Sequence, residues 1–75
     1  MKIRLNGEPH ELAHPLTVTA LLTELDLDPR RVAVERNLTV VRRSDYEATV
    51  IEEGDEIEVV NFVGGGARYR SLPKS

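Results

Sequence analysis

Residues 57–66 have the sequence Ile57-Glu58-Val59-Val60-Asn61-Phe62-Val63-Gly64-Gly65-Gly66, in which an apolar strand runs without a turn into three consecutive glycines. Glycine has no Cβ, so three in a row cost much backbone entropy to order unless another protein holds them. Such a backbone can enter a narrow slot that excludes any larger residue. We therefore interpret residues 1–63 as a scaffold that presents a flexible tail, residues 64–66. In the alternative interpretation, the glycines only link the domain to residues 67–75.

The alternation of this strand assigns its side chains to two faces. Ile57 and Val59 fall on one face, which we expect to be buried. The other face carries two apolar residues beside two carboxylates, a pattern typical of a contact patch with a polar rim. This predicted partner-binding patch consists of Glu56, Glu58, Val60 and Phe62. A second interpretation of Phe62, that it completes the core, stays open at this point.

The N-terminal residues predict a hairpin followed by a helix. Asn6-Gly7 is the strongest two-residue hairpin signal, and it lies in the middle of a predicted hairpin over residues 2–12. Apolar residues spaced i, i+3, i+4 and i+7 then predict one amphipathic helix over about residues 17–27, capped by Thr17. The core residues expected from these two elements are Ile3, Leu5, Val18, Leu21, Leu22 and Leu25.

The middle of the chain predicts a second hairpin and a connection to the last strand. Residues 32–41 contain two short apolar strands, residues 32–35 and residues 38–41, on either side of the turn candidate Asn37, and Val34 is expected in the core. Residues 42–48 are polar and predict a loop or a single helical turn, with Tyr46 as a packing lid over the small core. Glu53-Gly54-Asp55 then marks a tight turn into the last strand. The predicted order is strand, strand, helix, strand, strand, strand.

This order is that of the β-grasp fold, and the chain resembles the ThiS family. The resemblance covers residues 1–66 and rests on the order and spacing of several short motifs. These motifs are Val32-Ala33-Val34-Glu35-Arg36-Asn37, Val40-Val41, Tyr46, Glu53-Gly54-Asp55 and the run from Ile57 to Gly66. The resemblance implies an α+β, ubiquitin-like domain with a mixed four- to five-stranded sheet and one main helix packed across it. The length of 75 residues allows one such domain with one small core.

ThiS-like proteins are sulfur carriers of thiamin (thiazole) biosynthesis, and the resemblance implies the same role here. The reactive residue would be Gly66, with Gly65 and Gly64 as its lead. A ThiF-type adenylyltransferase would activate the terminal carboxylate with ATP, a sulfur donor would convert it to a thiocarboxylate, and a ThiG-type thiazole synthase would use the sulfur. The carrier would be a co-substrate of these enzymes, not an enzyme, and would bind no cofactor. Two alternatives remain: a MoaD-like carrier for another pathway such as molybdopterin, and a β-grasp interaction module without covalent chemistry.

The chain departs from the family at the glycines, because family members end there and this chain continues through residues 67–75. Gly66 is therefore an amide, with no carboxylate to activate. Three explanations compete: a protease, as a further partner, removes the extension; the extension is artefactual; or carrier function has been lost. We expect removal or an artefact, and we expect the extension to be disordered.

Charge and composition restrict the partners. Three of the 10 Lys and Arg residues lie in the extension, so residues 1–66 hold 7 bases against 13 acids, a net charge of −6. An acidic domain disfavours nucleic acid and favours proteins with a basic face. No apolar run approaches a membrane span, no signal-peptide pattern is present, and there is no Cys, so we expect a cytoplasmic protein without membrane contact.

One motif suggests a different function. The segment His10-Glu11-Leu12-Ala13-His14 fits the H-E-x-x-H pattern of zinc metalloproteases, which works only on a helix. Pro9 and Pro15 flank these five residues, and a residue before proline avoids the helical region. We therefore predict a strand with its exit loop here, and no metal site.

Overall fold

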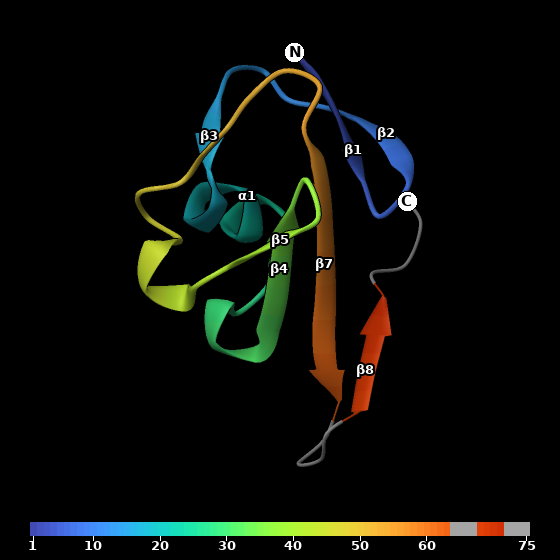
Figure 1. Ribbon diagram of the computed structural model, residues 1–75, viewed down its shortest axis with the longest axis vertical. Helices are drawn as coiled ribbons and strands as arrows, with labels where there is room; N and C mark the ends of the chain where they lie inside the picture. The colour runs from blue at the N-terminus through green and yellow to red at the C-terminus, as the bar shows by residue number, and fades with distance from the viewer. Residues whose placement is uncertain (64–67, 72–75) are drawn as a thin grey trace.

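The computed structural model describes the backbone of residues 1–63 and 68–71 and the side chains of residues 1–61. Its elements form a mixed sheet with one helix on a single face, together with a small second sheet (Figure 1). The elements are β1 (Lys2–Leu5), β2 (Glu8–Glu11), β3 (Leu16–Thr17), α1 (Val18–Glu24), the 3₁₀ turn η1 (Pro29–Arg31), β4 (Val32–Arg36), β5 (Thr39–Val41), the 3₁₀ turn η2 (Arg43–Asp45), β6 (Val50–Ile51), β7 (Glu56–Val63) and β8 (Arg68–Ser71).

The main sheet has the strand order β2-β1-β7-β4-β5, with β8 also paired to β7. Strands β1 and β7 are parallel neighbours, whereas β1–β2, β4–β5 and β4–β7 are antiparallel. The N-terminal strand and the long final strand thus lie side by side at the centre of one mixed sheet (Figure 1). The predicted β-grasp fold is confirmed.

Both predicted hairpins form around two-residue turns in the left-handed region. Asn6 and Gly7 have φ of 51° and 83°, and Asn37 and Leu38 have φ of 52° and 70°. Turns of this kind match the twist of the flanking strands, and they require positive φ at both central residues. The expected start of the second strand at Leu38 is corrected to Thr39, because Leu38 occupies the turn itself.

Helix α1 begins as predicted and ends three residues early. The Ala20 N–H donates to Thr17 Oγ1, which confirms the predicted cap. The helix ends at Glu24 because Asp26 adopts a left-handed φ of 61°. The Asp26 N–H then bonds the Thr23 C=O and the Leu27 N–H bonds the Leu22 C=O, the two hydrogen bonds of a Schellman C-cap.

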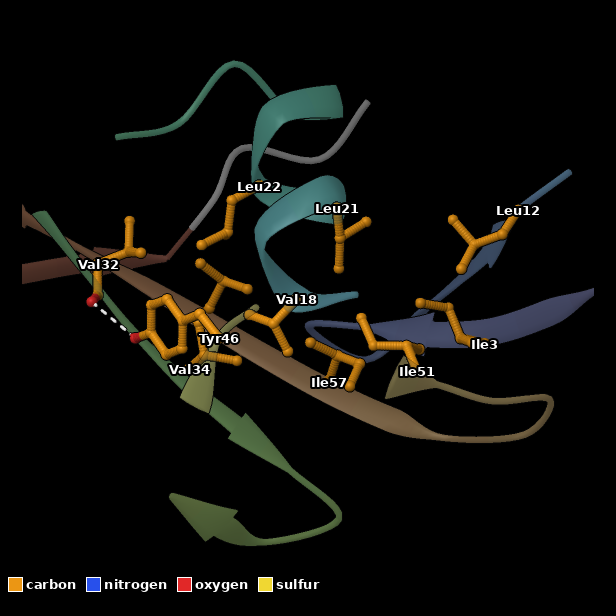
Figure 2. Packing of buried hydrophobic residues seen from close by; sticks show 11 residues of the cluster. Ile3, Leu12, Val18, Leu21, Leu22, Val32, Val34, Tyr46, Ile51 and Ile57 are labelled. Atoms are coloured by element: carbon orange, nitrogen blue, oxygen red, sulfur yellow. Dashed lines mark hydrogen bonds between the residues drawn. The ribbon is translucent and has the colours of Figure 1, made fainter. Parts of the chain in front are cut away.

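The core lies between α1 and the sheet, as Figure 2 shows. Leu5 and Leu25, both expected in the core, are only partly buried at its margin. Tyr46 covers the core as predicted, with 3% exposure, and its hydroxyl donates to the Val32 C=O at 3.3 Å. Among residues 1–61, the buried apolar residues are Ile3, Leu12, Val18, Leu21, Leu22, Val32, Val34, Tyr46, Ile51, Ile57 and Val59. All of them lie between residues 3 and 59, so a chain that ends at residue 66 retains this core.

A small second sheet, absent from the sequence-based expectation, anchors the loop after β5. Strands β3 and β6 pair antiparallel, Leu16 with Ile51 and Thr17 with Val50. The N–H groups of Val18 and Thr19, which open the helix, bond carbonyls of the same loop. The loop thereby satisfies donors that a helix start leaves without an intrahelical partner.

The extension also differs from expectation, because four of its residues form a strand. Strand β8 pairs antiparallel with the end of β7, from Val63 with Arg68 to Val60 with Ser71 (Figure 1). Disorder was predicted from composition, which takes no account of the open edge that β7 offers. Within the described part of the chain, no helix has the length and apolar character of a membrane span.

Candidate functional site

Strand β7 carries the predicted partner-binding residues, and its central position fixes them. It pairs with β4 from Ile57 to Asn61 and with β1 at Glu56 and Ile57. Ile57 and Val59 are 1% and 0% exposed, which confirms that their face is the core.

The opposite face of β7 points away from α1. On this outward face Glu56 and Glu58 are exposed and Val60 is half-buried. The side chain of Phe62 lies outside the described side chains, so its assignment to the core or to a contact patch stays a prediction.

The outward face combines acidic and apolar positions. Glu58 lies opposite Glu35 of β4, and Val60 lies opposite Ala33. Like charges at directly opposed positions repel each other, and no ion pair among the described side chains involves either glutamate. Val40 of β5, opposite Glu35, is 67% exposed. Among the described side chains, this face therefore offers negative charge without a basic partner next to apolar surface, which suits a binding partner with a basic rim.

A buried carboxylate fixes the beginning of β7. Asp55, 7% exposed, accepts hydrogen bonds from Arg36 Nε at 2.6 Å, from Asn37 Nδ2 at 3.1 Å and from the Glu52 N–H at 2.9 Å. Asn37 also accepts the Glu56 N–H through its side chain and donates its own N–H to the Glu56 C=O. The β4–β5 turn is thereby joined to the first residue of β7.

The hydrogen bonds around Asp55 shift the pKa values of Asp55 and Arg36. Burial by itself would raise the pKa of Asp55, but the hydrogen bonds from Arg36, Glu52 and Asn37 outweigh it and hold the pKa below its ordinary value. The bond to Asp55 likewise raises the pKa of Arg36. Both groups are therefore charged at neutral pH, and their attraction supports the turn before the strand.

A side-chain amide replaces a strand partner at the middle of β7. The Val59 N–H donates to Asn6 Oδ1 at 2.8 Å, and Asn6 Nδ2 donates to the Val59 C=O at 3.1 Å. Asn6 thus continues the β1 side of the sheet for one more residue after β1 has ended. The sequence identified Asn6 only as a turn residue, since nothing in its local pattern reveals a contact that is 53 positions away.

The structure does not describe the predicted reactive residues Gly64, Gly65 and Gly66. Their role stays a prediction. The backbone of β7 is described up to Val63, the residue before the glycines.

The zinc hypothesis loses its geometric basis. His10 lies in β2 and His14 beyond its end, where its Nδ1 lies 3.0 Å from the Pro15 C=O. The five-residue segment is not a helix, which the H-E-x-x-H pattern requires. The absence of a bound metal stays a prediction.

The arrangement as a whole defines a class: a ubiquitin-like β-grasp domain whose final central strand runs toward a glycine sequence. Comparison with known proteins identifies the family within this class. The sequence model of the ThiS family matches residues 3–66. The chain therefore belongs to the ThiS family.

Solved structures agree with this assignment. The crystal structure of the thiamine biosynthesis protein ThiS from Geobacter metallireducens matches with a TM-score of 0.77 and 38% sequence identity, over 88% of this chain and all of that one. The solution structure of a thiamine biosynthesis protein from the same organism has a TM-score of 0.76 at 33% identity.

Among curated relatives, a thiazole synthase from Magnetococcus marinus is 54% identical over 66 residues, and one from Paramagnetospirillum magneticum is 48% identical over 67. The chain spans about a fifth of the length of these two proteins, 20% and 21%. The sulfur carrier protein ThiS from Bacillus subtilis is 38% identical over 50 residues, which are 67% of this chain and 76% of that protein.

Proposed function

We propose that this protein is a sulfur carrier of thiamin biosynthesis whose reactive group is the carboxylate of Gly66, exposed after processing. The observation that supports this most directly is the family match, which extends through residue 66. The strand before the glycines is fixed by Asn6, Asn37 and Asp55, as expected for a domain that presents its tail in a defined direction.

The chemistry proposed for Gly66 follows from the poor reactivity of a carboxylate. In the first step a carboxylate oxygen attacks the α-phosphate of ATP, an O–P bond forms, and pyrophosphate leaves. In the second step hydrosulfide attacks the carbonyl carbon of the resulting acyl-adenylate, a C–S bond forms, the C–O bond to AMP breaks, and AMP leaves, so that the product is the thiocarboxylate. Adenylation is needed because it converts the carboxylate oxygen into part of a good leaving group. The enzyme supplies the stabilisation of developing charge, so the carrier is a co-substrate without a bound cofactor.

The proposed partners are a ThiF-type adenylyltransferase and a ThiG-type thiazole synthase. The resemblance of this chain to a segment of two longer thiazole synthases supports the second partner. The outward face with Glu56, Glu58 and Val60, together with Phe62, is proposed as the docking patch, because it joins apolar surface to carboxylates that form no ion pair with any of the described side chains. The third proposed partner is a protease that cuts after Gly66.

Intact mass spectrometry tests the carrier function. The chain ending at Gly66 is incubated with a ThiF-type enzyme, ATP and sulfide, and it should gain about 16 Da as oxygen is exchanged for sulfur at the activated acyl carbon. The chain of 75 residues should not react, because Ser75 follows Leu72-Pro73-Lys74, which do not fit a slot for glycines. A thiocarboxylate on the longer chain would remove the need for processing. No product on the shorter chain would contradict the carrier function with this enzyme, and a product only with the activating enzyme of a MoaD-like carrier would assign the other pathway.

A further inference from the structure

Strand β7 extends beyond the ends of the strands β1 and β4 that pair with its two edges. On one edge β4 pairs up to Asn61, opposite Val32. On the other edge β1 pairs only with Glu56 and Ile57, and the Asn6 side chain then bonds the backbone of Val59. Of the strands described, neither β1 nor β4 reaches the final two residues of β7, and β1 does not reach residues 60–63.

Strand β8 covers this remaining edge over its full length. Figure 1 shows β8 beside the end of β7. The register pairs Val60 with Ser71, Asn61 with Arg70, Phe62 with Tyr69 and Val63 with Arg68. Within the described chain, β8 is thus the strand that pairs with the last two residues before the glycines.

Charge favours the same pairing. Residues 67–75 contain three basic residues and no acid, whereas residues 1–66 carry a net charge of −6. Opposite charges attract the extension to the domain. The short connection between β7 and β8 also gives β8 a high effective concentration at the edge, of millimolar order for short linkers.

We propose that the edge of β7 over residues 60–63 is a strand-addition site and that β8 is an internal inhibitory strand occupying it. Strand addition draws affinity from main-chain hydrogen bonds, and one edge accepts one strand at a time. An enzyme that engages the end of β7 therefore competes with β8 until cleavage or displacement removes it. The inhibitory consequence rests on the proposed carrier function, whereas the strand-addition site does not.

The site is tested by peptide titration followed by NMR. A synthetic peptide of residues 67–75, added in trans at millimolar concentration to the chain 1–66, should shift the amide signals of residues 60–63. The chain of 75 residues should show no such shifts, because its own β8 already fills the edge. A control peptide with proline in place of Tyr69 and Arg70 should not bind, since proline lacks the N–H that a strand donates. Absent shifts in the chain 1–66, or shifts centred on other strands, would overturn the proposal.

The inhibition is tested in the full chain with two matched double variants. Tyr69→Pro with Arg70→Pro removes both N–H groups, one of which points toward β7. Tyr69→Thr with Arg70→Thr removes the same side chains but keeps the N–H groups and a strand-favouring residue. The proline variant should lose hydrogen-exchange protection at residues 60–63 and bind a ThiF-type enzyme without ATP several-fold more tightly than the parent chain. The threonine variant should behave like the parent. Equal affinity of the proline variant and the parent, or equal release by both variants, would refute inhibition by strand pairing.

Failure of this inference and failure of the carrier function can be told apart. Thiocarboxylate formation is measured on the chain 1–66, which lacks β8, so it does not depend on the inhibitory strand. The peptide titration contains no enzyme, so it does not depend on sulfur chemistry.

Discussion

Replacement of Asp55 should destabilise the fold more than is usual for a residue in a turn, because its carboxylate is buried. The Asp55 side chain is 10% exposed, and that of Arg36, its ion-pair partner, is 31% exposed. Asp55→Ala leaves three donors without their acceptor, from Arg36, Asn37 and the Glu52 backbone. A charge-assisted bond contributes about 1.5–3 kcal/mol and a neutral one about 1 kcal/mol, but water can reach Arg36 in the variant. We therefore expect Asp55→Ala to lower the free energy of unfolding by about 3 kcal/mol.

Asp55→Asn should lower the free energy of unfolding by about half as much, ~1.5 kcal/mol, because the amide oxygen still accepts one hydrogen bond although the charge is lost. For a domain of this size, a change of 1 kcal/mol moves the melting temperature by roughly 4–8 °C. Thermal unfolding at pH 7 followed by circular dichroism measures both effects. The control is Glu47→Ala, which removes the same charge from an exposed site where the carboxylate forms no ion pair with the described side chains, and its free energy of unfolding should stay within about 0.5 kcal/mol of the parent.

The pH dependence of stability distinguishes the contribution of the Asp55 charge from that of the shape of its side chain. Its pKa lies below the ordinary value of 3.8, so the folded state binds its proton less readily than the unfolded state. The stabilisation is fully present above pH values near 3.8 and is lost as the pH falls through the lower pKa of the folded state. The gap in stability between the parent and Asp55→Asn should therefore narrow below that pH. A gap that is the same at pH 7 and in acid, or an Asp55→Ala variant as stable as Glu47→Ala, would refute this account.

Two further variants test other contacts. Asn6→Gly keeps the positive φ of 51° but removes both hydrogen bonds to the Val59 backbone. It should lower the free energy of unfolding, measured in urea, by about 1–3 kcal/mol and increase hydrogen exchange at the Val59 amide. Unchanged exchange at Val59 would contradict the role of the Asn6 side chain. Tyr46→Phe removes the donor to the Val32 C=O while keeping the buried ring, so it should cost about 1 kcal/mol, and an equally stable variant would show that this bond contributes nothing.

The sequence predicted the regular elements because their signals are local. Asn6-Gly7 specifies its hairpin through the φ values that the turn requires, and Thr17 begins the helix through a bond to a residue three positions later. The alternation of β7 placed Ile57 and Val59 in the core and Glu56 and Glu58 outside it. Each of these inferences depends on a few neighbouring residues.

What the sequence could not supply depends on contacts between distant residues. The pair formed by β3 and β6 has only two residues in each strand, too few to show a period, and it joins Leu16 to Ile51. Leu12, which follows β2, and Ile51, in the short strand β6, are buried through the path of the chain and not through an apolar repeat. The extension looked disordered because its composition is polar, whereas its pairing depends on an edge that only the folded sheet exposes.

The contacts along β7 change in kind from its beginning to its end. At the beginning, Asp55 and Asn37 hold the strand through side chains inside the domain, and at Val59 the Asn6 amide does the same. From residue 60 onward, that edge is paired with a strand that follows the glycines in the chain. Removing the extension therefore leaves every described core residue and side-chain anchor in place and alters only the pairing of the strand's end. A carrier of the proposed kind needs this separation, because its tail must be released without loosening the domain that directs it.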